Sequence, residues 1–252
     1  MKSGLLLAVG LLAACTGFAA SELGTAKLRT VPITVYPSFD VAGTSFVAEF
    51  NRFARPGDAV VVSFTDAFKQ PFRVAKLGVR QGDVWVYTNQ DASLTQSLHR
   101  NMEGMRGVVF IADRYDPKST RLTVNSLREQ TRSLAMPLTV GLEYRETKTL
   151  YNVTDVARDA DAITIYSNGT LREGRQAFRA YVERVVKAAR EENPKIKVEI
   201  AIAVGRDATA TAALLAVIQD NIEIADRIGI YCNETPESLA SLSALVSGMR
   251  GV

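Results

Sequence analysis

The sequence predicts an α/β fold, a compact single-domain (β/α)8 TIM barrel that follows an N-terminal signal peptide. Three observations carry this prediction. Eight short apolar runs have the length of strands, nearly every run is followed by a segment of helical character, and the unit repeats to the end of the chain. Strands that alternate with helices indicate parallel βαβ units, and eight units in this length fit a closed barrel.

The expected elements alternate along the whole chain after a polar lead-in at residues 21–30. The strands are expected at 31–38, 59–64, 84–88, 108–112, 137–142, 162–167, 197–204 and 227–232. The helices are expected at 42–54, 71–79, 93–105, 119–134, 153–158, 173–192, 209–221 and 236–249. An open doubly wound sheet is the alternative, and it is disfavoured because no G-x-G-x-x-G loop follows the first strand.

Composition and charge limit the function classes. The formal net charge is +3 and no run of like charge occurs, so a nucleic-acid partner is not expected. The single histidine, His99, falls within an expected helix. One histidine disfavours a His-rich metal site and a Ser-His-Asp triad, so neither a metal nor a cofactor is expected.

Residues 1–20 are predicted to be a signal peptide, which leaves residues 21–252 for the barrel domain. Lys2 precedes an apolar run at 4–14 that is too short to span a bilayer. Two processing sites stay open. Leu12-Ala13-Ala14-Cys15 resembles a bacterial lipobox, in which Cys15 becomes the lipidated first residue, and Gly17-Phe18-Ala19 offers ordinary cleavage. The expected location is extracytoplasmic, as a secreted protein or a membrane-anchored lipoprotein that meets the membrane only through its lipid.

The second cysteine, Cys232, is left without a partner once Cys15 is removed or lipidated. A lone cysteine makes no intrachain disulfide. Its neighbours in the sequence are apolar, so we expect an inert buried thiol rather than a nucleophile.

One strand ending recurs through the chain. The run 161–170, DAITIYSNGT, has close copies at 83–89 (DVWVYTN) and 228–233 (IGIYCN) and a looser copy at 33–38 (ITVYPS). Each copy ends in Tyr, then any residue, then Asn or Ser. We interpret these copies as strand ends that gather tyrosines and amides around one mouth of the barrel.

Strand side chains alternate between the barrel lumen and the surrounding helices, so each strand can be split into two faces. Ile163 and Ile165 are expected to face the helices. The expected lumen-facing sets are Thr34, Tyr36, Ser38; Phe64, Asp66; Trp85, Tyr87, Asn89; Val109, Ile111, Asp113; Thr139, Gly141, Glu143; Thr164, Tyr166, Asn168; Ala201, Ala203, Gly205; and Gly229, Tyr231, Asn233. Gly141, Ala203 and Gly205 are expected to leave room beside the rings. Barrel enzymes carry their active site at the carboxyl ends of the strands, so the sequence predicts a ligand cleft there.

Acidic residues follow several expected strands, and Asp113 and Glu143 end two neighbouring ones. Glycosidic hydrolysis uses two carboxyl groups, and adjacent strands lie about 4.8 Å apart. The sequence therefore predicts a glycoside hydrolase acting on carbohydrate, with Glu143 as general acid and Asp113 as base or nucleophile. Whether the protein is an enzyme stays open.

The other predicted site residues would bind a carbohydrate or another small polar ligand. They are Tyr36, Asp66, Tyr87, Asn89, Tyr166, Asn168, Arg206, Asp207, Tyr231, Asn233 and Glu234. The strings VYPS and GIYxN resemble strand ends of secreted barrel glycosidases, such as the spherulin-4-like and barrel-type lysozyme families, but the resemblance covers only these residues and implies no catalytic assignment. The alternatives are a non-catalytic barrel that binds a glycan or a small anion, with Arg206 holding the anion, and an envelope-associated structural protein.

Overall fold

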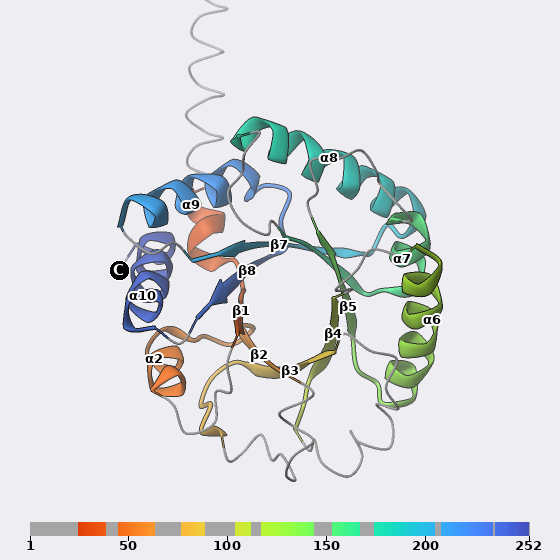
Figure 1. Cartoon of the computed structure of the whole chain (residues 1–252), viewed down its shortest axis with the longest axis horizontal. Helices are drawn as coiled ribbons and strands as arrows, with labels where there is room; N and C mark the ends of the chain where they lie inside the picture. Colours follow the sequence, from red (N-terminus) through yellow and green to blue (C-terminus); the bar gives the residue numbers. More distant parts are fainter. Residues whose placement is uncertain are drawn as a thin grey trace, which may run out of the picture.

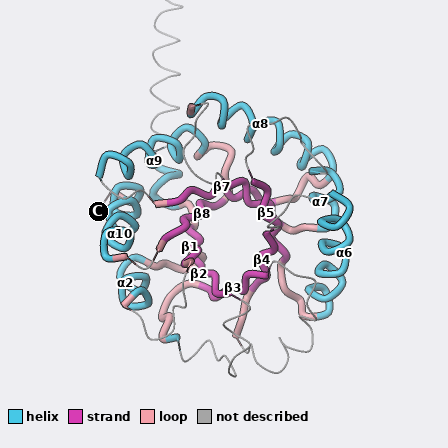
Figure 2. Tube along the Cα trace, viewed as in Figure 1, coloured by secondary structure: helices cyan, strands magenta, loops and turns pink. Residues whose placement is uncertain are grey.

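The computed structural model describes residues 25–38, 45–63, 77–88, 104–111, 117–143, 153–166, 174–204, 208–233 and 235–251. Eight strands close into one barrel in the order β1 to β8, and β8 pairs in parallel with β1. Viewed along the barrel, the strands form an inner ring and the helices lie outside it (Figure 1, Figure 2). The predicted (β/α)8 fold is confirmed.

All eight expected strands are present. They are β1 (Ile33–Pro37), β2 (Ala59–Ser63), β3 (Asp83–Thr88), β4 (Gly107–Ile111), β5 (Leu138–Glu143), β6 (Ala162–Tyr166), β7 (Lys197–Ala203) and β8 (Arg227–Cys232). The helices are α2 (Phe46–Phe53), α6 (Pro117–Ser133), α7 (Val153–Asp159), α8 (Arg175–Glu192), α9 (Ala208–Asn221) and α10 (Pro236–Arg250). The predicted signal peptide at 1–20 lies outside the described residues. The expected helix at 93–105 does as well, except for its last two residues. Within the part of the chain that the structure describes, no helix is long and apolar enough to cross a membrane.

The expected polar lead-in is wrong in part, because residues 25–30 are helical. Leu28 and the following Val31 are each 5% exposed. The Lys27 ammonium donates a hydrogen bond to the Glu223 carbonyl at 2.9 Å. A helix this short is not stable by itself, and packing against the rest of the barrel stabilises it.

Two separate apolar clusters result from the alternation of side chains along the strands. The outer cluster lies between the sheet and the helices and includes Ile163, Ile165 and Ile200, each fully buried. The inner cluster fills the lumen and consists of Tyr36, Ala59, Val61, Trp85, Val109 and Ile111, with Tyr87, Tyr166 and Tyr231 packed against it. The expected faces of β1, β3, β4 and β6 agree with this division.

The described part of β2 has its own division of faces. Val60 and Val62 belong to the outer cluster, whereas Val61 belongs to the inner one. Pairing fixes this register, because Val61 lies beside Trp85 and Ser63 beside Tyr87. The run AVVVS has no polar alternation, so its pattern did not reveal which face is inside; Phe64 and Asp66 lie outside the described residues.

Three aspartates fix the relation between successive strands at the amino ends of the barrel. Each aspartate directly precedes one strand. Its carboxylate accepts a hydrogen bond from a backbone N–H at the start of the strand before it, either from the first residue or from the second. The bonds are Ile33 N to Asp58 Oδ1 at 2.8 Å, Leu138 N to Asp161 Oδ2 at 2.9 Å and Val198 N to Asp226 Oδ2 at 2.9 Å. These carboxylates satisfy backbone donors where a parallel ladder begins.

Asp58 also anchors the end of the chain. It forms a salt bridge of 2.7 Å with Arg250, and the two side chains are 2% and 3% exposed. Arg250 donates a second hydrogen bond to the Phe53 carbonyl. The last helix is thereby tied to the segment between α2 and β2.

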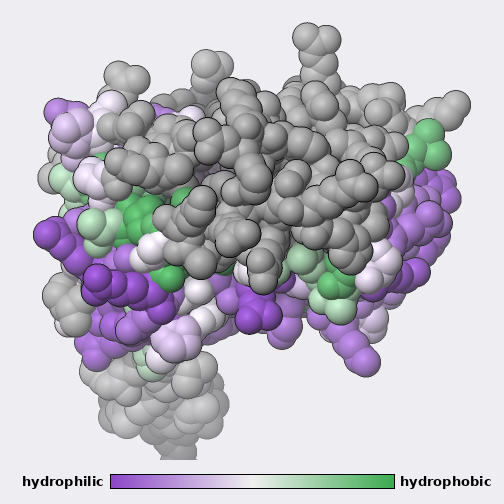
Figure 3. All heavy atoms as spheres, turned by 90° about the horizontal axis from the view of Figure 1, so that it is seen from below, coloured by the Kyte–Doolittle hydropathy of each residue, from purple (hydrophilic) through white to green (hydrophobic). Residues whose placement is uncertain are grey.

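The outer surface of the described residues is mainly polar. Figure 3 shows one side of the molecule, with hydrophilic residues along the flanks and small hydrophobic areas between them. Leu122 is the large hydrophobic side chain that is exposed among the described residues, at 62%. The apolar surface that matters for function lies inside the barrel mouth.

Candidate ligand-binding site

A cavity of about 490 Å³ opens at the carboxyl ends of the strands. Its lining comes from β1, β2, β3, β4, β6, β7 and β8, and includes the aromatic side chains of Tyr36, Tyr87, Tyr166 and Tyr231. Small-molecule sites of a few hundred cubic ångströms are typical of this end of a barrel. The cavity therefore lies where the sequence predicted a cleft.

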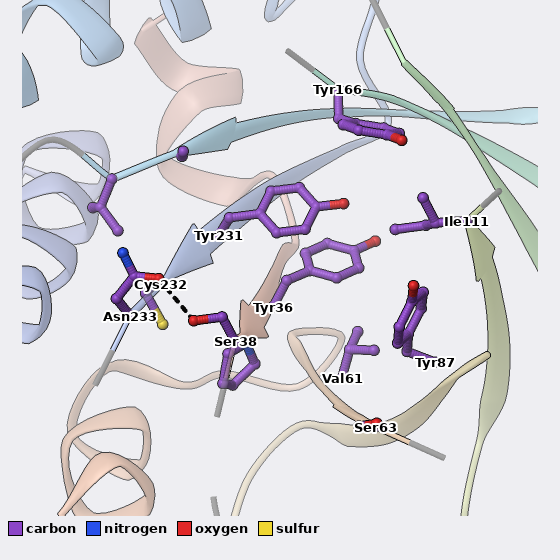
Figure 4. Close-up of a pocket in the computed structure, with 13 residues that line it drawn as sticks. Tyr36, Ser38, Val61, Ser63, Tyr87, Ile111, Tyr166, Tyr231, Cys232 and Asn233 are labelled. Carbon is purple, nitrogen blue, oxygen red and sulfur yellow. Dashed lines mark hydrogen bonds between the residues drawn. The ribbon is translucent and has the colours of Figure 1, made fainter. Parts of the chain in front are cut away.

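The tyrosine rings form a continuous aromatic wall. The rings of Tyr36 and Tyr231 are stacked, with centroids 4.6 Å apart and planes 22° apart. Tyr166 lies on Tyr231 with centroids 6.0 Å apart and planes tilted by 52°. Figure 4 shows the rings of Tyr36, Tyr87 and Tyr231 converging on the middle of the barrel, near Ile111.

A buried carboxylate lies beneath this wall. Glu199 projects from β7 into the lumen and is 2% exposed. It accepts hydrogen bonds from Thr34 Oγ1 at 2.5 Å, from Thr164 Oγ1 at 2.9 Å and from the Tyr36 hydroxyl. A carboxylate that accepts from three hydroxyls is well satisfied, so Glu199 holds the floor of the cavity in one arrangement.

Gly229 makes the space for this arrangement. A Cβ atom there would lie 2.7 Å from the Ala201 Cβ, 2.9 Å from Glu199 Oε1 and 3.0 Å from Tyr36 Cε2. These distances are too short for a side chain. The glycine of the IGIYC strand is thus required by the carboxylate and the ring beside it.

Burial and the nearby carboxylate keep the tyrosines of the wall protonated. Burial, followed by the charge of Glu199, raises the pKa of Tyr36 well above its ordinary value. The same two causes, in the same order, raise the pKa of Tyr231. Both hydroxyls therefore remain neutral hydrogen-bonding groups at physiological pH.

Tyr231 differs from Tyr36 in its hydrogen bonding. Its hydroxyl oxygen is buried and has no hydrogen-bond partner among the described residues. A buried hydroxyl without a partner costs about 1–3 kcal/mol. Because Tyr231 lines the cavity, a bound molecule can supply the missing bond.

A cationic group lies near the carboxylate, on the neighbouring strand. The Arg227 guanidinium lies over the Trp85 ring, 5.0 Å from its centroid, and donates to Thr34 Oγ1 at 3.3 Å. Thr34 thus links Arg227 to Glu199. Arg227 is the register partner of Glu199 on the neighbouring strand and is not among the described residues that line the cavity.

The rim of the cavity is polar where β1 and β8 end. The Ser38 hydroxyl donates to Asn233 Oδ1 at 2.7 Å, and the Ser38 backbone N–H donates to the Cys232 carbonyl at 2.9 Å. The Asn233 N–H donates in turn to the Ser238 hydroxyl at 3.0 Å. This chain of bonds sets the position of the Asn233 amide at the mouth.

Cys232 also borders the cavity, but it is buried, at 2% exposed. Burial raises the pKa of its thiol to about 12. A protonated thiol is a poor nucleophile. This agrees with the expectation of an inert cysteine.

Five of the predicted ligand-binding residues line the cavity, namely Tyr36, Tyr87, Tyr166, Tyr231 and Asn233. Their role in binding stays a prediction. Asp66, Asn89, Asn168, Arg206, Asp207 and Glu234 lie outside the described residues. Asp113 does as well, and Glu143 is described only as the last residue of β5, without its side chain.

The expected free space is only partly present. Ala203 borders the cavity, as predicted. Gly141 leaves no room, because a Cβ there would lie 2.7 Å from Ile111 Cγ1 and 3.4 Å from Tyr166 Cε1. The ring and the isoleucine occupy the volume that the glycine vacates. Gly205 lies outside the described residues.

Sequence reasoning missed Glu199 and Arg227. The alternation of side chains predicts both positions. On β7 it places Ala203 and Ala201 in the lumen, and the next lumen position toward the amino end is Glu199. On β8 it places Tyr231 and Gly229 in the lumen, and the next position is Arg227. The search for acids considered only residues after the strand ends. A charged residue at a lumen position inside an apolar strand was the signal that could have found them.

No protein-family model matches the chain, and no curated protein matches it. Solved structures do share its fold. An aldolase from Escherichia coli matches with a TM-score of 0.53 and 10% identity, over 92% of this chain and 93% of that one. A putative fructose-1,6-biphosphate aldolase from Coccidioides immitis matches with a TM-score of 0.60 and 8% identity, over 93% and 95%. The C-terminal domain of a putative chitinase from Desulfitobacterium hafniense matches with a TM-score of 0.54 and 9% identity, over 87% and 99%.

These identities are low, so the likeness shows the fold alone. The chain is a (β/α)8 barrel with a tyrosine-lined cavity at the carboxyl ends of its strands. No group of three or more His, Cys, Asp or Glu side chains among the described residues is arranged to hold a metal ion.

The prediction of a glycoside hydrolase acting on carbohydrate is wrong. The solved structures that match over nearly their whole length include two aldolases as well as the putative chitinase domain, and they do not single out a glycoside hydrolase. The described residues that line the cavity carry no carboxyl group. Glu199 lies below the lining with both oxygens already bonded.

Proposed function

We propose that the protein binds a small polar organic molecule in the tyrosine-lined cavity. The observation that carries the proposal is the buried Tyr231 hydroxyl, which has no partner among the described residues and belongs to a ring that lines the cavity. The stacked rings offer flat apolar surface, and the hydroxyl offers a directed hydrogen bond. A concave site with much apolar surface and a few placed polar groups is the usual form of a ligand site.

Rigidity of the walls also supports binding. Tyr36 is held by its hydrogen bond to Glu199 and by stacking on Tyr231. Binding to a site that is already ordered avoids the entropy cost of fixing side chains. The network beneath the rings thus prepares the cavity for a ligand.

Filling the cavity should abolish binding. Ala203 borders the cavity and its side chain is exposed to it, so Ala203→Phe places a ring in the ligand volume. The matched control is Ala240→Phe, which adds the same ring at an exposed position of α10. Both variants and the wild type are screened by ligand-observed NMR against a library of small polar fragments.

The expected result is a set of fragments that bind the wild type and the Ala240→Phe control but not Ala203→Phe. Tyr231→Phe should weaken the best of these fragments by about tenfold, because it removes the hydrogen bond that a ligand completes. Binding that persists in Ala203→Phe, or a screen without any hit on the wild type, would refute the proposal.

A lyase-type reaction is the second candidate, and the fold shared with two aldolases favours it. Tyr231 is the group in the described cavity suited to such chemistry. Its protonated hydroxyl can donate to an oxygen that gains negative charge when a carbon–carbon bond breaks. The test is release of aldehyde from a panel of hydroxy-ketones and hydroxy-acids, which should be lost in Tyr231→Phe. Turnover by Tyr231→Phe equal to that of the wild type would exclude this role.

Export from the cytoplasm is a further part of the proposal, and it rests on the sequence of residues 1–20. The mature N-terminus can be determined by mass spectrometry. A diacylglycerol-modified Cys15 would indicate a lipoprotein, and a free N-terminus beyond Ala19 would indicate ordinary secretion. An unprocessed Met1 on the protein in its native host would contradict export.

A further inference from the structure

We propose that the ligand is an organic cation, a protonated amine attached to an apolar body; this inference rests on the proposed function. The cavity joins aromatic ring faces to a buried carboxylate, with no positive side chain among its described lining residues. Each of these features favours a positive charge over a neutral or negative group.

The ring faces supply the first part of the argument. The four tyrosines of the lining carry negative electrostatic potential on their faces, which attracts ammonium groups. The stacked pair Tyr36 and Tyr231 and the tilted Tyr166 form one extended wall. An apolar body can lie on the wall while its ammonium group meets the rings.

Glu199 supplies the second part. Its carboxylate is buried and is hydrogen-bonded to Tyr36, which lines the cavity. Charges in a poorly hydrated interior act over longer distances than charges in water. A cation in the cavity is therefore attracted to Glu199, while a carboxylate or phosphate in the same place is repelled.

Arg227 has partners of its own. Its guanidinium lies over the Trp85 ring and donates to Thr34, and Arg227 is not among the described residues that line the cavity. Glu199 is instead hydrogen-bonded to Tyr36, which does line the cavity. The negative group is thus the one joined directly to the cavity wall, which argues against the small anion that the sequence suggested as a ligand.

Tyr231 completes the recognition. Its hydroxyl oxygen lacks a partner among the described residues and can accept a hydrogen bond from an ammonium N–H. Its own proton then remains available to a second polar atom of the ligand. A quaternary ammonium, which has no N–H, would use the rings but not this oxygen.

Three probes of equal size test the sign of the charge. Cyclohexylamine, which is protonated at pH 7, cyclohexanol and cyclohexanecarboxylate share one ring and differ in the charge of a single substituent. Their dissociation constants for the wild-type protein are measured by isothermal titration calorimetry or NMR. The ammonium is expected to bind at least about tenfold more tightly than the alcohol, and the carboxylate most weakly.

Glu199→Gln tests the origin of the preference. The amide keeps an oxygen acceptor for the hydroxyls and removes the charge. The preference for the ammonium over the alcohol should fall to within about threefold, and cyclohexanol measured on the same variant corrects this ratio for any change in the cavity floor. The wild-type comparison decides the inference even if this variant does not fold.

Equal binding of the three probes would overturn the cation inference and leave the proposed function standing. Tightest binding of cyclohexanecarboxylate would also overturn it and would indicate an anion site. A fragment screen with neutral hits but no response to cyclohexylamine would refute the inference in the same way. Failure of both the probes and the fragment screen would refute the proposed function itself.

Discussion

The Tyr36 hydroxyl donates a hydrogen bond to the Glu199 carboxylate across the lumen of the barrel. This bond connects β1 to β7, two strands that are separated by β8 in the sheet. Thr164 of β6 donates to the same carboxylate, so one buried charge holds three strands together. The polar floor of the cavity is therefore part of the stability of the barrel as well as part of the candidate site.

Tyr36→Phe is expected to destabilise the fold by about 1.5–3 kcal/mol, because it removes a hydrogen bond to a buried carboxylate. The matched control is Tyr231→Phe, which removes a buried hydroxyl that has no partner among the described residues and should leave the free energy of unfolding unchanged or raise it. Urea unfolding of the two variants measures the difference. Equal losses of unfolding free energy would show that the Tyr36–Glu199 bond contributes little.

Alkaline pH should destabilise the protein through the same tyrosines. The pKa values of Tyr36 and Tyr231 are raised in the folded state. Above pH of about 10 the unfolded chain loses protons that the folded chain keeps, so the free energy of unfolding falls as pH rises. Their contribution is fully present below that pH.

The pH effect is measured by urea unfolding between pH 8 and 11. The double variant Tyr36→Phe/Tyr231→Phe should lose stability less steeply than the wild type above pH of about 10, because it lacks both groups. Parallel curves for the two proteins would contradict the raised pKa values.

Asp58→Asn should be strongly destabilising, by about 3–5 kcal/mol, because it leaves the buried Arg250 charge without a counter-charge. Asp58 also accepts backbone hydrogen bonds from Ile33 and Arg55, at 2.8 and 2.7 Å. The control is Arg52→Ala, which breaks an ion pair whose arginine side chain is 78% exposed. That change should cost no more than about 1 kcal/mol in thermal or chemical unfolding. A loss for Asp58→Asn as small as for Arg52→Ala would argue against a stabilising buried pair.

Gly229→Ala should destabilise the barrel by about 1–3 kcal/mol and disturb the cavity floor, because the added methyl group collides with Ala201 and Glu199. Gly248→Ala is the control. Its added methyl group would lie 3.4 Å from Leu215, within α10, where alanine is the better helix former. The control should be neutral or stabilising, and a Gly229→Ala variant with wild-type stability would contradict the tight packing described above.

The thiol of Cys232 should resist alkylation in the folded protein. Its pKa is raised to about 12 by burial, so little thiolate is present at pH 8. Peptide mass spectrometry after treatment with iodoacetamide should show slow labelling of Cys232 in buffer and fast labelling in urea. Rapid labelling of the folded protein would mean that the thiol is open to the cavity and ionised.

The sequence by itself determined the architecture and much of the register. Alternation of eight apolar strands with helical segments is a local property of the chain, and it predicted the closed barrel. The two-residue period placed Tyr36, Tyr87, Tyr166 and Tyr231 in the lumen, because every second side chain of a strand must share a face. It did not place β2, where three consecutive valines give no alternation.

The tertiary structure decided the chemistry of the mouth. Glu199 and Arg227 lie 28 positions apart in the sequence yet are paired in register across β7 and β8, and Tyr36 reaches Glu199 from a strand 163 positions away. The pairing of β8 with β1 brings these groups together, and a local sequence pattern does not predict contacts between such distant residues. A closed sheet directs side chains from distant strands into a common interior. Closure of the barrel therefore brings the tyrosines of the repeated strand endings together as an aromatic wall above one buried carboxylate.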